Sequence, residues 1–410
     1  MTPDRLDLHK FWFGQTLSQL GSSFTLFALP LLVFKRTGSA LDLGIAAALN
    51  ILPYLLFGLV LGAWVDRTDR RRLMILADVA RALVVASVPM IELTHAVPVG
   101  WLYGVGFVST TLTIVFEAGE FAALPSLASG HDLVALNGRI QASYSTAQVL
   151  GPVLAGLLVA VLPVSTLLAV DAASFLISAA SLAVIRRPFH AEDTPPASRL
   201  RDDVREGLRY VVRHPVLRGI AVMMALANML VASAGALLVV LAKERWSASD
   251  TELGWLYSAA SLGMVSFALF AAPLRKRLSF SVLALSALAL NGACIAGMGL
   301  TSSYAVALIL WGVCGGTAIL FNVLATSLRQ AIVPNHLLGR VTTTASVLAW
   351  STIPVGVLTS GAFVQSQHSS SAVYLVLGGA MLLVPCAFAF TAVGRADRCL
   401  PPPAGAERTR

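Results

Sequence analysis

Acidic and basic side chains inside long apolar stretches are the residues of this sequence that could do chemistry. Asp171 is the clearest case, because it lies well inside the apolar run 164–185 and no Lys or Arg is near it on the same predicted helix. An ionised carboxylate is costly in an apolar span, so such an acid favours its neutral form and is a candidate for proton exchange. The alternative is a protonated Asp that hydrogen-bonds a polar neighbour for packing. The sequence leaves both interpretations open.

Two further sets of ionisable residues fall within or beside predicted membrane helices. Glu117 and Glu120 are near the end of the fourth apolar run, and Asp78 and Arg81 are three residues apart, which places them on one helix face. Both sets favour gating or interfacial ion pairs over proton carriage. Glu117 is the second candidate for proton coupling after Asp171.

Neutral polar residues form a stripe on the first predicted helix. They recur every three or four residues on an otherwise apolar helix and are Gln15, Ser18, Gln19, Ser22 and Ser23. Such a stripe is expected to face a water-filled cavity. Further candidates for the lining of that cavity are Asn50, Gln141, Ser145, Gln148, Tyr257, Asn322 and Trp350. This lining is poor in fixed charge and suits a bulky amphiphilic molecule, although interhelical hydrogen bonds explain each residue singly.

The composition indicates an integral membrane protein. Hydrophobic residues make up 57% of the chain, charged residues 12%, and the mean hydropathy is +0.78, whereas soluble domains are about 45–50% apolar and about 25% charged. The net charge of +8 does not indicate nucleic-acid binding, because the cations lie between apolar runs, as membrane topology requires. The four cysteines have no metal-site or redox spacing, so we expect no metal and no cofactor.

The apolar runs predict an all-α protein that crosses the membrane twelve times. Each run is close to the length of about 20 residues that a bilayer requires, and they cover 12–34, 42–63, 73–92, 99–119, 140–162, 164–185, 216–242, 251–274, 280–300, 304–327, 341–364 and 372–394. We expect an N-terminal six-helix bundle over 1–185, a cytoplasmic central loop over 186–215, a C-terminal six-helix bundle over 216–394 and a cytoplasmic tail over 395–410. Within the loop, the apolar spacing from 200 to 212 predicts an amphipathic helix along the membrane surface, the alternative being a flexible tether.

Basic residues predict that both termini are cytoplasmic. In that orientation the outer connections hold only Lys35, Arg36, Lys243 and Arg245, and every other Lys or Arg except Arg81 falls in a cytoplasmic segment. The first apolar run lacks a small-residue cleavage site, so we expect it to be a retained helix.

The two halves repeat each other in the same orientation. Asp-Leu-Gly at 42–44 opens the second run and Glu-Leu-Gly at 252–254 opens the eighth, and a basic turn follows each of these runs, at 66–72 and 275–277. Independent spans have no reason to share loop chemistry, so the pattern indicates two six-helix bundles related by a parallel pseudo-repeat.

The stretch 62–72, Gly-Ala-Trp-Val-Asp-Arg-Thr-Asp-Arg-Arg-Arg, places six charges between two apolar runs. It resembles motif A of the major facilitator superfamily, and the matching residues are Gly62, Asp66, Arg67, Arg70 and Arg71. Asp69, where many members have Gly, resembles the drug:proton antiporter branch with macrolide-efflux and enterobactin-exporter proteins. The resemblance implies a conformational switch in which Asp66 meets the inner end of the eleventh helix, around 341–343. A positive-inside hairpin of another polytopic protein is the alternative.

The segment 148–156 in the fifth run resembles a helix-five motif of superfamily exporters. Gly151, Pro152 and Gly156 match the pattern, while Ala147 and Ala155 replace two glycines. Ordinary packing of small residues is an equal alternative. The fourth run has no Arg, which proton-coupled relatives of other branches often carry there, and this departure leaves their coupling mechanism in doubt.

These observations favour a secondary transporter that exports an amphiphilic small molecule of the drug, macrolide or siderophore class by alternating access, in exchange for protons. A lipid flippase or nutrient importer of the same fold is the alternative. No catalytic cluster indicates an enzyme, and no phosphate-binding loop indicates ATP-driven export. We expect a monomer in the bacterial cytoplasmic (inner) membrane whose partners are the substrate, protons and the lipid bilayer. The residues do not identify the substrate.

Overall fold

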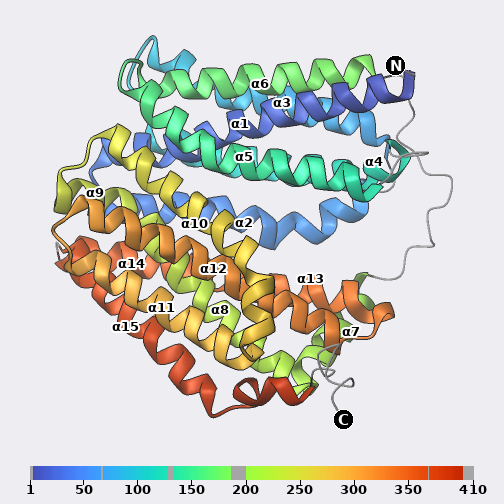
Figure 1. Ribbon diagram of the computed structural model, residues 1–410. Helices are drawn as coiled ribbons and strands as arrows, with labels where there is room; N and C mark the ends of the chain where they lie inside the picture. Colours follow the sequence, from blue (N-terminus) through green and yellow to red (C-terminus); the bar gives the residue numbers. More distant parts are fainter. Residues whose placement is uncertain (1–2, 66–67, 128–132, 186–199, 368, 400–410) are drawn as a thin grey trace. The chain divides into compact units, whose positions relative to one another are not determined.

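The computed structural model describes residues 3–65, 68–127, 133–185, 200–367 and 369–399 of the 410-residue chain (Figure 1). Over these residues the regular secondary structure is entirely helical. The first part of the chain forms α1 (Pro3–Thr37), α2 (Ala40–Val65), α3 (Arg70–Glu92), α4 (Val99–Leu127), α5 (Leu133–Val159) and α6 (Val164–Val184). The second part forms α7 (Leu200–Arg213), α8 (Pro215–Ala236), α9 (Leu238–Trp246), α10 (Asp250–Arg277), α11 (Phe280–Leu300), α12 (Tyr304–Ile332), α13 (Asn335–Ser351), α14 (Ile353–Gln367), α15 (Ser370–Ala389) and the 3-10 helix η1 (Val393–Cys399).

The helices correspond to the twelve predicted spans. Eleven helical segments of the described residues are long and apolar enough to cross a membrane, and α5 contributes a shorter apolar segment over 143–159. The predicted all-α membrane class is therefore confirmed.

Two of the spans are interrupted helices, although the apolar runs predict continuous ones. The seventh span is divided at Leu237 into α8 and α9, and the eleventh is divided at Thr352 into α13 and α14. Pro354 explains the second interruption, because its ring lacks an N–H donor and clashes with the carbonyl of Trp350 four residues earlier.

By its internal contacts the chain divides into two compact units. Unit 1 comprises residues 1–196, 236–258 and 357–368, and unit 2 comprises 197–235, 259–356 and 369–410. Unit 1 thus combines the first six helices with α9, the beginning of α10 and most of α14. The predicted domain boundaries, which follow the membrane repeat, stay a prediction.

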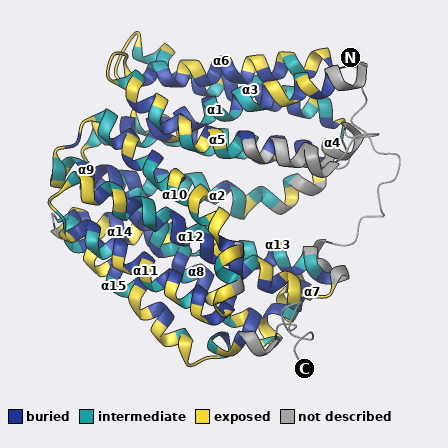
Figure 2. Cartoon of the chain, in the orientation of Figure 1, coloured by how far each residue is buried: buried dark blue, intermediate teal, exposed yellow. Residues whose placement is uncertain are grey.

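Within unit 1, glycines allow α1 to approach α6 closely. A Cβ atom at Gly21 would lie 2.2 Å from Ser174 Oγ and 2.7 Å from Asp171 Oδ1, and one at Gly14 would lie 2.1 Å from Ser181 Oγ. Larger residues at the two glycine positions would push α1 away from α6. Figure 2 shows buried residues along α6, on which α1 packs.

Glycines also mediate the contacts of α5 and α2 with the other segments of unit 1. A Cβ atom at Gly254 on α10 would lie 2.6 Å from the carbonyl oxygen of Pro152 on α5, and one at Gly44 on α2 would lie 2.5 Å from that of Val357 on α14. At the same end of unit 1, Lys35 Nζ lies 2.5 Å from Asp250 Oδ2. These helix ends are therefore joined by close backbone packing and an ion pair.

Within unit 2, α7 packs against α13. A Cβ atom at Gly207 would lie 2.6 Å from the carbonyl oxygen of Arg340, and Val211 is buried in a cluster with Val333, Leu337 and Val341. The predicted amphipathic helix is present, but this part of its apolar face contacts protein rather than a membrane surface. Leu208 and Val212, also expected on that face, are exposed.

Candidate functional site

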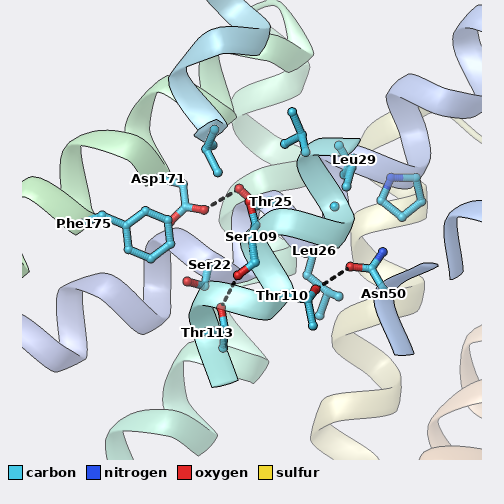
Figure 3. A pocket seen from close by; sticks show the side chains of 14 residues that line it. Ser22, Thr25, Leu26, Leu29, Asn50, Ser109, Thr110, Thr113, Asp171 and Phe175 are labelled. Atoms are coloured by element: carbon cyan, nitrogen blue, oxygen red, sulfur yellow. Dashed lines mark hydrogen bonds between the residues drawn. The ribbon is translucent and has the colours of Figure 1, made fainter. Parts of the chain in front are cut away.

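A cavity of about 190 Å³ lies inside unit 1, between α1, α2, α3, α4 and α6 (Figure 3). One part of its wall is apolar and is formed by Leu26, Leu29, Pro30, Val85, Val105, Gly106 and Phe175. The other part is polar, and each of its side chains contains an oxygen atom. It is formed by Ser22, Thr25, Asn50, Ser109, Thr110, Thr113 and Asp171. The cavity can therefore accommodate a small group that is partly apolar and partly hydrogen-bonding.

Asp171 supplies the one carboxyl group of this wall. Its side chain is 1% exposed, and the Thr25 hydroxyl donates a hydrogen bond to Oδ2. Ser174, one turn further along α6, lies 3.3 Å from Oδ1 and donates to the Asp171 carbonyl at 2.7 Å. The close approach of α1 at Gly21 brings Thr25 to this carboxyl. Hydroxyl groups can donate to a carboxylate or accept from a carboxylic acid, so these partners suit both protonation states.

Asp78 and Arg81 form an ion pair in the interior of unit 1, where their side chains are 0% and 4% exposed. The guanidinium carbon of Arg81 lies 4.5 Å from the ring centroid of Phe116 and 4.3 Å from that of Phe175. Arg81 Nη1 also lies 3.5 Å from the hydroxyl of Thr113. Cation–π contacts on two faces hold the guanidinium beside the cavity wall, which includes Phe175 and Thr113.

Glu117 and Glu120 accept hydrogen bonds from tyrosines rather than forming ion pairs with the side chains that the structure describes. The hydroxyl of Tyr54 on α2 donates to Glu117 Oε2 at 3.3 Å, and that of Tyr144 on α5 donates to Glu120 Oε2 at 2.6 Å. Glu117 is exposed, whereas Glu120 is buried. The two acids therefore occupy different environments although they are three residues apart.

The basic hairpin joins the start of α3 to the end of α6. The side chain of Asp69 caps α3 by accepting from the Arg72 backbone N–H at 3.2 Å, and Arg71 donates to the carbonyls of Leu182 and Ala183. Arg71 thereby adds donors for carbonyls at the end of α6, where the Leu182 carbonyl also accepts from the Ile185 N–H at 3.3 Å. Gly62 lies in α2 and Arg70, which begins α3, is buried, while Asp66 and Arg67 lie outside the described residues.

The helix-five residues lie at close helix contacts within unit 1. Gly151 faces Ser23 on α1, where a Cβ atom would lie 1.8 Å from Ser23 Oγ. Gly156 packs against Gly254, and its carbonyl accepts a hydrogen bond of 2.8 Å from the Thr251 hydroxyl. Pro152 contributes a carbonyl to the same contact with α10.

Comparison with known proteins places the chain in a family. The family described as transmembrane secretion effectors matches residues 5–398. The chain belongs to this family, within the major facilitator superfamily. The multidrug efflux pump Tap of Mycolicibacterium fortuitum is 29% identical over 390 residues, which cover 91% of this chain and 92% of that protein. Macrolide efflux protein A of Streptococcus pyogenes is 29% identical over 184 residues, 45% of each chain.

Solved structures support the same fold. The nucleoside transporter NupG superposes with a TM-score of 0.74 at 13% identity, over 96% of this chain and 100% of that one. A bacterial homologue of the iron transporter ferroportin, in an inward-facing state, gives a TM-score of 0.73 at 17% identity, over 95% and 98%. The predicted superfamily membership and fold are thus confirmed, and the chain is a membrane transporter, not an enzyme.

The structure brings only part of the predicted lining of the transporter to the cavity. Asn50 lines it and accepts a hydrogen bond of 3.1 Å from Thr110. Gln15 is instead buried against α6, where its amide donates to Ser178 at 3.1 Å, and Gln19 lies beside Tyr144. Ser22 of the polar stripe also lines the cavity, whereas Gln148 is exposed and the Tyr257 ring lies in edge contact with the Phe27 ring, at 5.8 Å between centroids.

The candidates of unit 2, Asn322 and Trp350, are exposed on α12 and α13. Sequence reasoning missed the contribution of α4, which provides Ser109, Thr110 and Thr113 to the cavity. The signal was available in the run Ser-Thr-Thr-Leu-Thr from 109 to 113, a cluster of hydroxyl groups in an otherwise apolar span.

Proposed function

We propose that this transporter exports an amphiphilic small molecule of the drug, macrolide or siderophore class by alternating access, in exchange for protons. The export of drugs is supported by the relatives named as multidrug and macrolide efflux proteins. The observation that carries the proton exchange is the buried carboxyl of Asp171 in the wall of a cavity whose other polar groups are neutral.

The surroundings of Asp171 are those expected of a proton site. No Lys or Arg is among its hydrogen-bond partners in the described part of the chain, so an ionised carboxylate there lacks direct charge compensation. The group therefore binds a proton while the cavity is closed to water. It releases that proton when water or a cationic group of the substrate enters and compensates the charge.

The cavity supports binding of one part of the substrate. Pockets that enclose a drug-sized molecule have volumes of about 300–1,000 Å³, and the cavity in unit 1 is smaller, at about 190 Å³. We infer that a polar or amine-bearing group of the substrate enters it while the rest of the molecule lies outside. Leu26 and Phe175 then cover the apolar part of that group.

In the proposed cycle the close helix contacts act as reversible closures. The Gly156–Gly254 contact and the Lys35–Asp250 ion pair open when the substrate leaves on that side. On the other side, Asp66 is proposed to meet the positive end of the helix dipole around 341–343, an interaction that contributes about 0.3–1 kcal/mol. We place the transporter as a monomer in the bacterial inner membrane with both termini in the cytoplasm.

The test is transport by purified protein in liposomes with and without a pH gradient. We expect Asp171→Asn to retain exchange of labelled substrate but to lose much of the accumulation driven by the gradient, because exchange requires reorientation without net proton release. Asp42→Asn is the matched control, since Asp42 also accepts a hydroxyl hydrogen bond, from Tyr103 at 2.6 Å, but lies in the first turn of α2.

Undiminished accumulation by Asp171→Asn would exclude Asp171 as the coupling residue and shift the assignment to Glu117. If the substrate moves in the same direction as the protons rather than in the opposite direction, the protein is instead an importer of the same fold.

A further inference from the structure

We infer that Glu120 is a second proton-binding site of unit 1 and that Arg81 is the counter-ion it shares with Asp171. This inference rests on the proposed proton exchange and adds to it a further carboxyl, a positioning arginine and a proton count. It is carried by the burial of Glu120, by an oxygen atom of that side chain to which no described residue donates a hydrogen bond, and by the position of Arg81.

The buried charges of this cluster do not balance if every acid is ionised. Asp78, Glu120 and Asp171 are buried in unit 1, and Arg81 is the one guanidinium within electrostatic range of all three among the described residues. Arg81 is already paired with Asp78. An uncompensated buried charge costs several kcal/mol, so Glu120 and Asp171 are both neutral, and each holds one proton in the resting protein.

The geometry of Glu120 fits a neutral carboxylic acid. Its side chain is 6% exposed, Tyr144 donates to Oε2 at 2.6 Å, and Oε1 is buried without a hydrogen-bond partner among the side chains that the structure describes. A carboxylate accepts at about four lone-pair positions, and one donor leaves most of that capacity unsatisfied. With the proton on Oε1, Oε2 becomes the carbonyl oxygen that accepts from Tyr144, and the cost of burial falls because the group is neutral.

The polar and charged groups around the two sites come from five helices. Glu120 is surrounded by Tyr144 on α5, by Glu117 on its own helix, and by Asp78 and Arg81 on α3. The groups around Asp171 are Thr25 on α1, Ser174 on its own helix, and the same Asp78 and Arg81. Among the described residues, Arg81 is therefore the one cation common to both environments.

The guanidinium of Arg81, which belongs to α3, contacts α4 at two residues that lie between the Asp171 cavity and Glu120. It contacts Thr113, which lines the Asp171 cavity, and Phe116, which lies one turn before Glu120. Thr113 and Glu120 are seven residues apart, which corresponds to about 10 Å along the helix axis. When one acid releases its proton, the positive charge of Arg81 stabilises the new carboxylate, and this leaves less compensation for the other. The two acids therefore release their protons in sequence rather than together.

The first part of the test is infrared spectroscopy of the purified full chain at neutral pH without substrate, read at the carbonyl stretch of protonated carboxyl groups. We expect Glu120→Gln and Asp171→Asn each to remove part of this band, and the double variant to remove both parts. Asp42→Asn is the matched control, because Asp42 also accepts from a tyrosine, Tyr103 at 2.6 Å, but lies in the first turn of α2, and it should leave the band unchanged. If Glu120→Gln leaves the band intact, the inference is wrong.

A second variant keeps the test valid if Glu120→Gln does not fold. Tyr144→Phe retains the acid and removes its one hydrogen-bond donor, so the carbonyl stretch of Glu120 should shift to higher frequency. Arg81→Lys retains a positive charge but loses the planar contact with Phe116 and Phe175, and it should move the pH at which both bands disappear. An unshifted spectrum in both variants would contradict the assignment.

The second part of the test measures how many protons are exchanged for each substrate molecule in liposomes. Loss of one exchanged proton lowers the limiting accumulation about tenfold for each pH unit of gradient, so Glu120→Gln should show this loss while Asp42→Asn does not. Wild-type accumulation by Glu120→Gln would show that Glu120 does not take part in coupling. If the wild-type protein ignores the pH gradient while the infrared bands behave as expected, the proposed proton exchange fails but the proton site at Glu120 stands.

Discussion

The interiors of the two units differ in charge, although both consist of packed apolar helices. Unit 1 buries Asp78, Arg81, Glu120 and Asp171 within its membrane helices. In the described part of unit 2, Arg329 near the end of α12 is the one charged side chain that is buried to this degree. The internal repeat therefore preserves the helices but not the ionisable groups.

Unit 2 uses neutral hydrogen bonds where unit 1 uses charges. Asn291 on α11 is fully buried and donates to the carbonyl of Cys314 at 2.9 Å and to the hydroxyl of Thr317 at 3.0 Å, both on α12. Such bonds hold two helices together without any group that titrates near neutral pH. In the proposed cycle, unit 1 binds and releases protons while these bonds keep the helices of unit 2 packed together.

The largest effect on stability is expected when the carboxylate of the buried ion pair in unit 1 is removed. Asp78→Asn leaves Arg81 buried without its partner, and we expect a loss of about 3–5 kcal/mol in the free energy of unfolding. Thermal unfolding of the detergent-purified transporter, followed by tryptophan fluorescence, measures this loss. The double variant Asp78→Asn/Arg81→Met is the control and should recover much of it, because it removes the uncompensated charge. Unfolding of Asp78→Asn at the wild-type temperature would show that the pair is not structurally important.

A smaller effect is expected from the neutral network of unit 2. Asn291→Ala leaves the buried Cys314 carbonyl without this donor and should cost about 1–3 kcal/mol in the same measurement. Proton-driven accumulation per folded molecule should be unchanged, since no titrating group is lost. Asn228→Ala serves as the control, because Asn228 is only partly buried and makes one hydrogen bond, to the Ala349 carbonyl at 3.2 Å. A change in the proton count of Asn291→Ala would contradict the division of roles between the units.

The smallest effect is expected where unit 2 does contain an ion pair. Glu206 on α7 and Arg340 on α13 are paired, but their side chains are 50% and 36% exposed, so water screens their attraction. Glu206→Gln should change the free energy of unfolding by less than about 1 kcal/mol, and this difference should shrink further at high salt. A loss as large as that of Asp78→Asn would show that exposure does not distinguish the two pairs.

The sequence by itself determined the membrane class, the number of spans and the pairing of Asp78 with Arg81. Each of these depends on order along one helix, since a run of about 20 apolar residues crosses a bilayer and residues three apart share a helix face. It also marked Asp171, because the absence of cations on the same helix can be read from the chain.

Only the tertiary structure decided which groups surround those residues. The rotation of each helix about its axis places Arg81 between Phe116 and Phe175, brings Tyr144 to Glu120 and turns Gln15 toward α6 instead of the cavity. That rotation depends on contacts between helices, such as the approach of α1 to α6 at Gly21, which is possible only because the partner residues Asp171 and Ser174 lie opposite a position without a side chain. Such contacts join residues about 150 positions apart, so the pattern of any single helix cannot determine them.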